Sequence, residues 1–106
     1  MIREDWISGD APEKVEKTVL ERDVQNACIR FARSQGAYCR KFSSPGNRSV
    51  PDYLILHEGI IWFVEFKRPG GKCTQKQLDE QSEIQRAGGE VWVTDSVEDF
   101  KERWWS

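Results

Sequence analysis

Two short apolar runs separated by a tight turn constrain this chain more than any other feature. Residues 53–56 and 60–64 are almost wholly apolar, and His57-Glu58-Gly59 lies between them. Apolar runs of this length, divided by a turn that contains glycine, are typical of two antiparallel strands. The sequence therefore predicts a hairpin with strands at about 51–57 and 60–67.

Charged side chains interrupt the apolar pattern at the open end of this hairpin. Asp52 precedes the first run, and Glu65 and Lys67 end the second. Because side chains alternate between the two faces of a strand, Glu65 and Lys67 share one face and Phe66 lies on the other. The hairpin brings Asp52 close to this pair. Two carboxylates beside an ammonium group suit a hard divalent cation and an activated water, which is the chemistry of phosphodiester cleavage.

Each of these residues also has an ordinary structural explanation. Asp52 is a common type of residue at the start of a strand. Glu65 and Lys67 could form an ion pair on a solvated sheet face. The chemical interpretation therefore depends on the three side chains meeting in the folded protein.

Helical periodicity precedes the hairpin. A helix is predicted from Thr18, as N-cap, to about Gln35, and Gly36 follows as a helix stop. Its apolar residues repeat at the spacing of one buried stripe; they are Leu20, Val24, Ala27, Cys28 and Phe31. Residues 1–16 are polar and acidic, and we expect a flexible N-terminal arm there, with a single domain over residues 17–106.

The remaining elements complete an α/β pattern. They are a strand at 37–43, a turn-rich loop at 44–49, a helix from Thr74 to about Ala87, a strand at 90–94 and a helix capped by Ser96. The predicted order is αβββαβα. Such an order is typical of a mixed four-stranded sheet flanked by helices.

Composition excludes several classes of protein. Three cysteines without CxxC spacing argue against a zinc site or a disulfide scaffold, and they favour reduced thiols in the cytoplasm. A single histidine excludes chemistry built on a histidine pair within one chain. No apolar run approaches the roughly 18 residues of a membrane span. We therefore expect one cytoplasmic domain of 106 residues.

The charge distribution is more informative than the net charge of −2. Residues 24–78 hold nine basic residues and three acidic ones, whereas the flanks are acidic. Two of those three acids are Asp52 and Glu65. A basic middle of this kind could track phosphates, although solvated surface charges would look the same in sequence.

An ordered set of motifs resembles a known family. The set comprises Glu21 in the first helix, Gly46 ahead of Val50-Pro51-Asp52, then Val64-Glu65-Phe66-Lys67, Arg68-Pro69-Gly70-Gly71 and Thr74-x-x-Gln77. With the αβββαβ order, it resembles the PD-(D/E)XK nuclease superfamily, and in its finer pattern the VRR-NUC branch, the virus-type replication-repair nucleases. The resemblance spans residues 18–95.

This resemblance implies an endodeoxyribonuclease that depends on Mg²⁺ or Mn²⁺. Small members of the family, often from phages, act as homodimers on branched DNA such as Holliday junctions, so we expect a homodimer in the host cytoplasm. The alternative is a catalytically inactive nuclease fold that binds branched nucleic acid without cutting it.

The expected metal ligands are Asp52, Glu65, the backbone carbonyl of Phe66 and Glu21. Lys67 would orient or deprotonate the attacking water. Glu21 could instead complete a capping box with Thr18, and Gln77 has the same ambiguity with Thr74. The resemblance favours a role for Gln77 in the catalytic site.

Basic and amide side chains around the site are the expected DNA contacts; they are Arg48, Arg68, Lys72, Lys41 and Asn47. His57 is expected in the hairpin turn, without a catalytic role. Trp104 and Trp105 near the C-terminus could be buried against a partner subunit.

Overall fold

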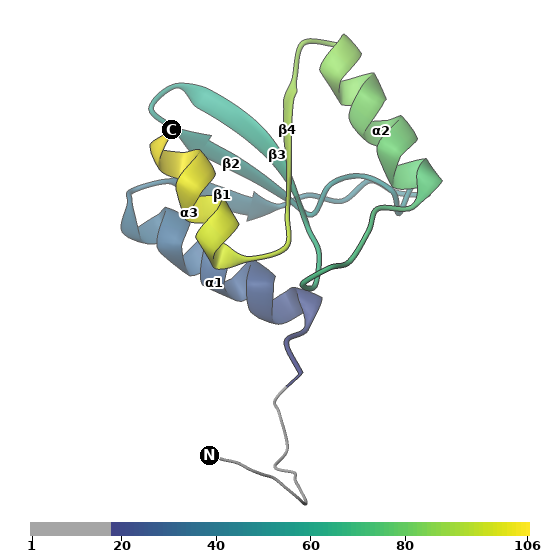
Figure 1. The fold of residues 1–106 in the computed structure, drawn as a ribbon. Coiled ribbons are helices and arrows are strands. Elements are labelled where there is room, and N and C mark those ends of the chain that lie inside the picture. The colour runs from purple at the N-terminus through teal and green to yellow at the C-terminus, as the bar shows by residue number, and fades with distance from the viewer. Residues whose placement is uncertain (1–17) are drawn as a thin grey trace, which may run out of the picture.

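A computed structural model describes residues 18–106, so the arm expected at 1–16 lies outside the described residues. Figure 1 shows the elements in chain order. They are α1 (Glu21–Ser34), β1 (Tyr38–Lys41), β2 (Tyr53–His57), β3 (Ile60–Phe66), α2 (Gln75–Arg86), β4 (Glu90–Thr94) and α3 (Val97–Trp105). The predicted order αβββαβα is confirmed.

The four strands form one mixed sheet in the order β1-β2-β3-β4. β1, β2 and β3 are successively antiparallel, and β4 runs parallel to β3. A parallel neighbour requires a crossover connection, and α2 supplies it. The expected α/β fold with a mixed four-stranded sheet is therefore confirmed.

The β2–β3 hairpin closes through a two-residue turn. Glu58 and Gly59 both have positive φ angles, of 49° and 84°. This combination is found in the turns whose twist matches that of paired strands. The resulting register places Tyr53 opposite Val64, so Asp52 comes opposite Glu65 one residue further along. The turn thus sets which side chains meet at the open end.

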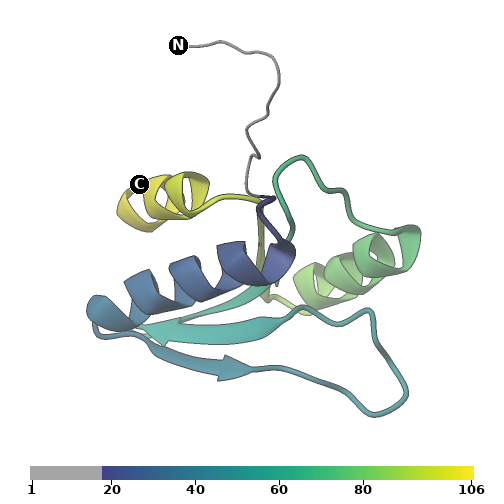
Figure 2. The ribbon, with the colours of Figure 1, turned by 90° about the horizontal axis from the view of Figure 1, so that it is seen from below.

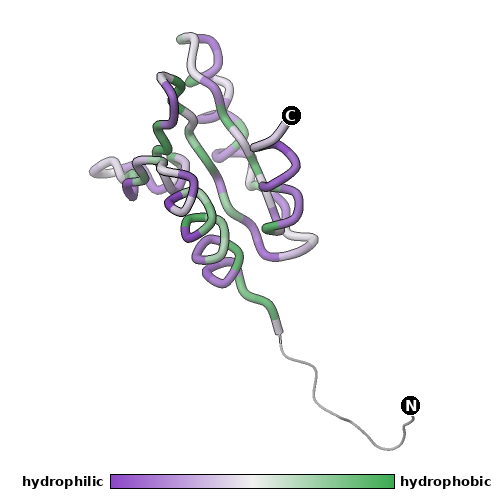
Figure 3. The backbone as a smooth tube through the Cα atoms, turned by 90° about the vertical axis from the view of Figure 1, so that its left-hand side faces the viewer, coloured by the Kyte–Doolittle hydropathy of each residue, from purple (hydrophilic) through white to green (hydrophobic). Residues whose placement is uncertain are grey.

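Two helices cover one face of the sheet. α1 and α3 contact each other and this face, and Figure 2 shows them on one side with α2 set apart. The core beneath them includes Val64, Phe66 and Phe100, each with 0% exposure. In Figure 3 the longer hydrophobic stretches lie in the strands, whereas hydrophilic and hydrophobic residues alternate along the helices. This packing holds the end of β3 rigid.

The start of α1 differs from the prediction. The helix begins at Glu21 with Leu20 as N-cap, so Thr18 is not the cap. The Leu20 backbone N–H donates to Asp23 Oδ2 over 2.8 Å. A leucine side chain has no acceptor, so only this half of a capping box is present. The capping-box alternative for Glu21 is therefore wrong, because Glu21 is the first residue of the helix.

The other face of the sheet is only partly covered. α2 contacts β4 near its own C-terminal end, where a Cβ on Gly89 would come within 2.6 Å of Ile84. Farther from α2, the register aligns Tyr38, Leu56 and Ile61 across three strands. These three side chains, the apolar row below, are 40–53% exposed. They lie on the sheet face that carries Glu65.

Two further expectations concern chemistry and location. Cys28, Cys39 and Cys73 are all free thiols, as the spacing predicted. Burial raises the pKa of the Cys28 thiol to about 12, so this residue is an inert part of the core. Over residues 18–106, no helix combines the length and the apolar character that crossing a membrane requires.

Candidate active site

Asp52, Glu65 and Lys67 meet at the open end of the hairpin, as predicted. The Phe66 backbone N–H donates to Asp52 Oδ2 over 2.8 Å, which fixes the Asp52 carboxylate beside the end of β3. Lys67 Nζ lies 3.8 Å from Glu65 Oε2. One turn and its register thus bring Asp52 to two charged groups that follow it in the next strand.

Burial excludes the idea that this pair sits on a solvated sheet face. Glu65 is 1% exposed and Lys67 is 9% exposed. Removing charged groups from water is costly unless they are paired or bind an ion. The two groups do lie within ion-pair distance, but the solvated face expected for them is wrong, and their burial favours a functional reason for keeping them.

Gln77 joins the two buried charges. Its side-chain oxygen accepts from Lys67 Nζ over 2.9 Å, and its Nε2 donates to Glu65 Oε2 over 3.0 Å. The same oxygen accepts the Thr74 backbone N–H, and Thr74 Oγ1 accepts the Gln77 N–H. Because a backbone N–H can only donate, the amide orientation is fixed. Both interpretations of Gln77 hold, since it caps α2 and contacts the site.

The two carboxylates are held in an unfavourable environment. Desolvation raises the pKa of Glu65 to about 7, and the nearby charge of Asp52 contributes in the same direction. Desolvation also raises the pKa of Asp52, although its hydrogen bond from Phe66 and the charge of Lys67 oppose the rise. A bound cation would offset the repulsion between these two carboxylates, because it stabilises the ionised form of each.

The residues present fit a divalent cation. Within residues 18–106, Glu65 Oε1 is the buried side-chain oxygen left without any hydrogen-bond partner. Such an oxygen is costly to bury unless it has a ligand. Asp52 and Glu65 provide oxygen donors of the type that Mg²⁺ and Mn²⁺ prefer. The donor set thus has one buried oxygen that is open to a cation or a water.

Glu21 does not complete a cluster of three carboxylates. It is exposed at the start of α1, and no group of three potential ligands is found among the described residues. Its charge still raises the pKa of Glu65, after the larger effects of burial and Asp52. Glu21 thus faces the site at longer range, and only contact through water remains as a proposal for it.

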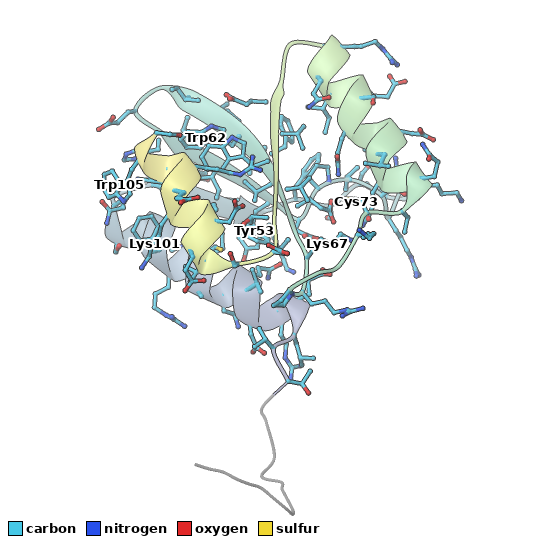
Figure 4. All side chains as sticks on the ribbon, viewed as in Figure 1. Tyr53, Trp62, Lys67, Cys73, Lys101 and Trp105 are labelled. Carbon is cyan, nitrogen blue, oxygen red and sulfur yellow. The ribbon has the colours of Figure 1, made fainter. Side chains whose placement is uncertain are left out.

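The expected DNA-contacting residues surround the site at different distances. Lys41 is close enough to lower the pKa of Asp52, and it lies 5.9 Å from the Tyr53 ring centroid. Arg68 and Lys72 are exposed in the loop after β3, and Figure 4 shows Lys67 near the start of that loop. Arg48 is exposed in the loop before Asp52.

The contacts of Asn47 and the position of Lys76 near the site were not predicted from the sequence. The Asn47 amide is used within the protein, because Nδ2 donates to Glu80 Oε1 over 3.1 Å and Oδ1 accepts the Ser49 N–H. Lys76 lies across from the same loop. Only its position beside Gln77 in the first turn of α2 hinted that it lies near the site.

The aromatic residues at the C-terminus divide into two roles. Trp104 packs within its own chain, against His57, Trp62 and Phe100, so its expected burial in a partner is not needed. Trp105 is 67% exposed. His57 stacks on Trp104 at the end of β2, at the opposite end of the hairpin from the carboxylates.

Comparisons with known proteins give a consistent result. No family model matches the chain. The chain is 40% identical over 81 residues to "Putative nuclease p44" of Acyrthosiphon pisum secondary endosymbiont phage 1, covering 76% of this chain and 87% of the relative. A solved structure described as "VRR_NUC domain" matches with a TM-score of 0.71 and 32% identity, over 77% of this chain and 90% of the other. Both similarities span most of the described domain.

Proposed function

Because this chain belongs to the VRR-NUC family of nucleases, we propose that it is a divalent-metal-dependent endodeoxyribonuclease. The observation that carries the proposal is the buried, unpartnered Glu65 Oε1, held opposite Asp52 and linked to Lys67 through Gln77. A purely structural carboxylate would have its oxygens satisfied within the protein. A carboxylate oxygen that has no partner and lies beside a second carboxylate suits an ion that arrives with the substrate.

In this proposal Asp52, Glu65 and the Phe66 backbone carbonyl hold Mg²⁺ or Mn²⁺. The ion supplies Lewis acidity toward the phosphate and lowers the pKa of a water. Lys67, held by Gln77, orients the attacking water and offsets negative charge that develops on the phosphate. Glu21 contributes through water from the start of α1.

The decisive experiment compares Asp52→Asn with wild-type protein in a plasmid-nicking assay. Loss of one ligand charge should lower the cleavage rate by about 100-fold or more in Mg²⁺ or Mn²⁺. Glu102→Gln is the control, because it removes the same charge from an exposed position on α3, away from the site. EDTA should abolish wild-type nicking. Undiminished nicking by Asp52→Asn would exclude this catalytic site.

Metal binding should also be visible without turnover. An ion that binds only the folded protein raises its melting temperature as its concentration increases. We expect Mg²⁺ and Mn²⁺ to stabilise the wild-type protein and to leave the melting temperature of Asp52→Asn unchanged. An equal shift in both proteins would place the ion elsewhere.

We also propose that the enzyme acts as a homodimer on branched DNA, such as a Holliday junction. The exposed apolar row offers an apolar surface that a second copy could cover on the sheet face that carries the site, and a two-fold axis would set two sites in fixed relation. Cleavage of labelled four-way, flap, splayed and linear DNA tests this selectivity. Comparable rates on all four would remove the junction preference and leave the nuclease activity intact.

The alternative is a module that binds branched DNA without cutting it. It predicts tight binding of a four-way junction with no cleavage in either Mg²⁺ or Mn²⁺.

The free thiols and the phage origin of the relative support a site of action in the host cytoplasm.

A further inference from the structure

A groove lies between the loop that precedes Asp52 and the first turns of α2. Its volume is about 650 Å³, and it is lined by Ser44, Gly46, Asn47, Arg48, Ser49 and Lys76. One wall is the loop of residues 44–49, and Lys76 forms the other. Polar backbone and hydroxyl groups line it alongside two cationic side chains. A groove of this composition suits an anionic ligand rather than an apolar one.

The loop wall is held in place by its own hydrogen bonds. A turn closes through the Asn47 N–H to the Ser44 carbonyl, with Gly46 at a φ of 78°. The Asn47 side chain then joins the loop to α2 through Glu80 and accepts the Ser49 N–H. The loop is thereby fixed relative to α2. A groove with fixed walls loses little conformational entropy when it binds a ligand.

Neither Arg48 nor Lys76 forms an ion pair within the part of the chain that the structure describes. Lys76 also borders the adjoining stretch of surface, where Asn47 and Ser49 lie beside the acidic side chains of Asp79, Glu80 and Glu83. An anionic backbone would therefore be attracted to the Arg48–Lys76 end and repelled from the neighbouring stretch, which gives the groove a direction.

Both walls of the groove continue directly into the catalytic site. The loop leads through Val50 and Pro51 to Asp52, and Lys76 is followed by Gln77, which contacts Glu65 and Lys67. A ligand in the groove is therefore positioned by the same segments that position the reacting groups. Contacts of this kind fix the register of a nucleic acid without reading its sequence.

We propose that this groove binds a backbone phosphate of the DNA strand being cut, with Lys76 as its main cation on α2 and Arg48 facing it from the loop. This inference rests on the proposed nuclease function and adds to it a strand-positioning contact. Asn47 and Glu80 set the distance between the two walls. The acidic stretch beyond Lys76 directs the rest of the strand away from α2.

The test measures how the DNA affinity of Lys76→Ala depends on salt. A fluorescein-labelled four-way junction is titrated with protein by fluorescence anisotropy, in Ca²⁺ so that binding is followed without turnover. Each lost phosphate contact should reduce the slope of log affinity against log salt by about 0.9. Lys76→Ala and Arg48→Ala should each show this reduction and bind the junction more weakly at every salt concentration.

The control is Lys101→Ala, which removes the same charge from α3. Lys101 lies 5.3 Å from the Phe31 ring centroid, and Figure 4 places it away from Lys67 and the start of α2. Its slope should equal that of wild type. Thermal melting first establishes that both variants are folded. If the slope of log affinity against log salt is then equal in Lys76→Ala and Lys101→Ala, the inference is overturned even if the wild-type protein cuts DNA. If the wild-type protein binds DNA but never cuts it, the nuclease proposal is refuted. The salt-dependence slopes then still test whether the groove binds a phosphate.

Discussion

Gln77 is the residue through which the two buried charges of the site are coupled. It accepts from Lys67 and donates to Glu65 with an amide orientation fixed by the Thr74 N–H. Gln77→Ala removes a donor that favours the ionised carboxylate, so the pKa of Glu65 should rise further. We expect cleavage to fall by about 10- to 100-fold, and its acidic limb to move to higher pH. A pH–rate profile measures both effects.

The matched control for this prediction is Gln81→Ala, one turn further along α2. Gln81 is also buried, but its Nε2 bonds to Cys73 Sγ at 3.4 Å rather than to the site. Gln81→Ala should lower stability without moving the pH profile. If both variants gave the same profile as wild type, Gln77 would be a helix cap and nothing more.

Glu65 should make the metal-free protein less stable as the pH rises. Its pKa is raised from 4.5 to about 7 in the folded state, so the folded protein binds the proton more tightly than the unfolded chain. The contribution of Glu65 to the free energy of unfolding is therefore fully present below about pH 4.5, and it is lost as the pH rises through 7. The loss is on the order of 3 kcal/mol. Thermal melts in EDTA across this range, with Glu65→Gln for comparison, measure it.

Glu65→Gln has no carboxyl group to titrate at this position. The decline of its free energy of unfolding with pH should therefore be smaller than that of the wild-type protein by the loss given above. The variant should also be more stable than wild type above pH 7. Added Mg²⁺ should recover stability at high pH in wild type alone, because the ion favours the ionised carboxylates. Parallel stability curves for the two proteins would show that Glu65 does not titrate in this range.

The three site residues were predictable because strand geometry determines their placement. Alternation along β3 separates Phe66 from Glu65 and Lys67, and a single turn brings Asp52 opposite them. Lys76 was not predictable in this way. Its distance from the loop of residues 44–49 depends on the Asn47–Glu80 contact, which joins residues 33 positions apart. Sequence periodicity carries no information about such a tertiary contact.

At the scale of elements, helix and strand types were predictable and the start of α1 was not. Thr18 and Glu21 form a sequence pattern for a capping box, but Leu20 and Asp23 provide the observed start. Both patterns place an acid three residues after a cap, and local sequence favours the wrong one, because threonine is a preferred N-cap and leucine is not. The packing of Val24 and Cys28 in the core decides where the first turn begins.

The observed cap gives a prediction about stability. Asp23→Ala removes the acceptor of the Leu20 N–H, so it should lower the free energy of unfolding by about 0.5–1 kcal/mol. Thr18→Ala should change it by less than about 0.5 kcal/mol, because exposed residues outside such contacts contribute little. Urea unfolding of the two variants measures the difference. A larger loss from Thr18→Ala would mean that the helix starts earlier in solution.

At the scale of the whole molecule, the uncovered sheet face distinguishes this fold from a fully enclosed one. α1 and α3 bury one face, whereas the apolar row is exposed on the other face, which also carries the site. Exposed apolar residues aligned across three strands are typical of an interaction surface rather than of chance. A second copy meeting this row would bury it and relate the two sites by a two-fold axis.

Ile60 and Ile61 provide a test of this surface within a single strand. They are adjacent in β3 and similarly exposed, at 48% and 51%, but they point to opposite faces of the sheet. Ile61→Asp would place a charge in the apolar row, so it should convert a dimeric protein to a monomer. Ile60→Asp adds the same charge on the α3 side and should leave the dimer intact. Sedimentation velocity of the two variants separates these outcomes, because a dimer that persists in Ile61→Asp but dissociates in Ile60→Asp would place the interface on the other face.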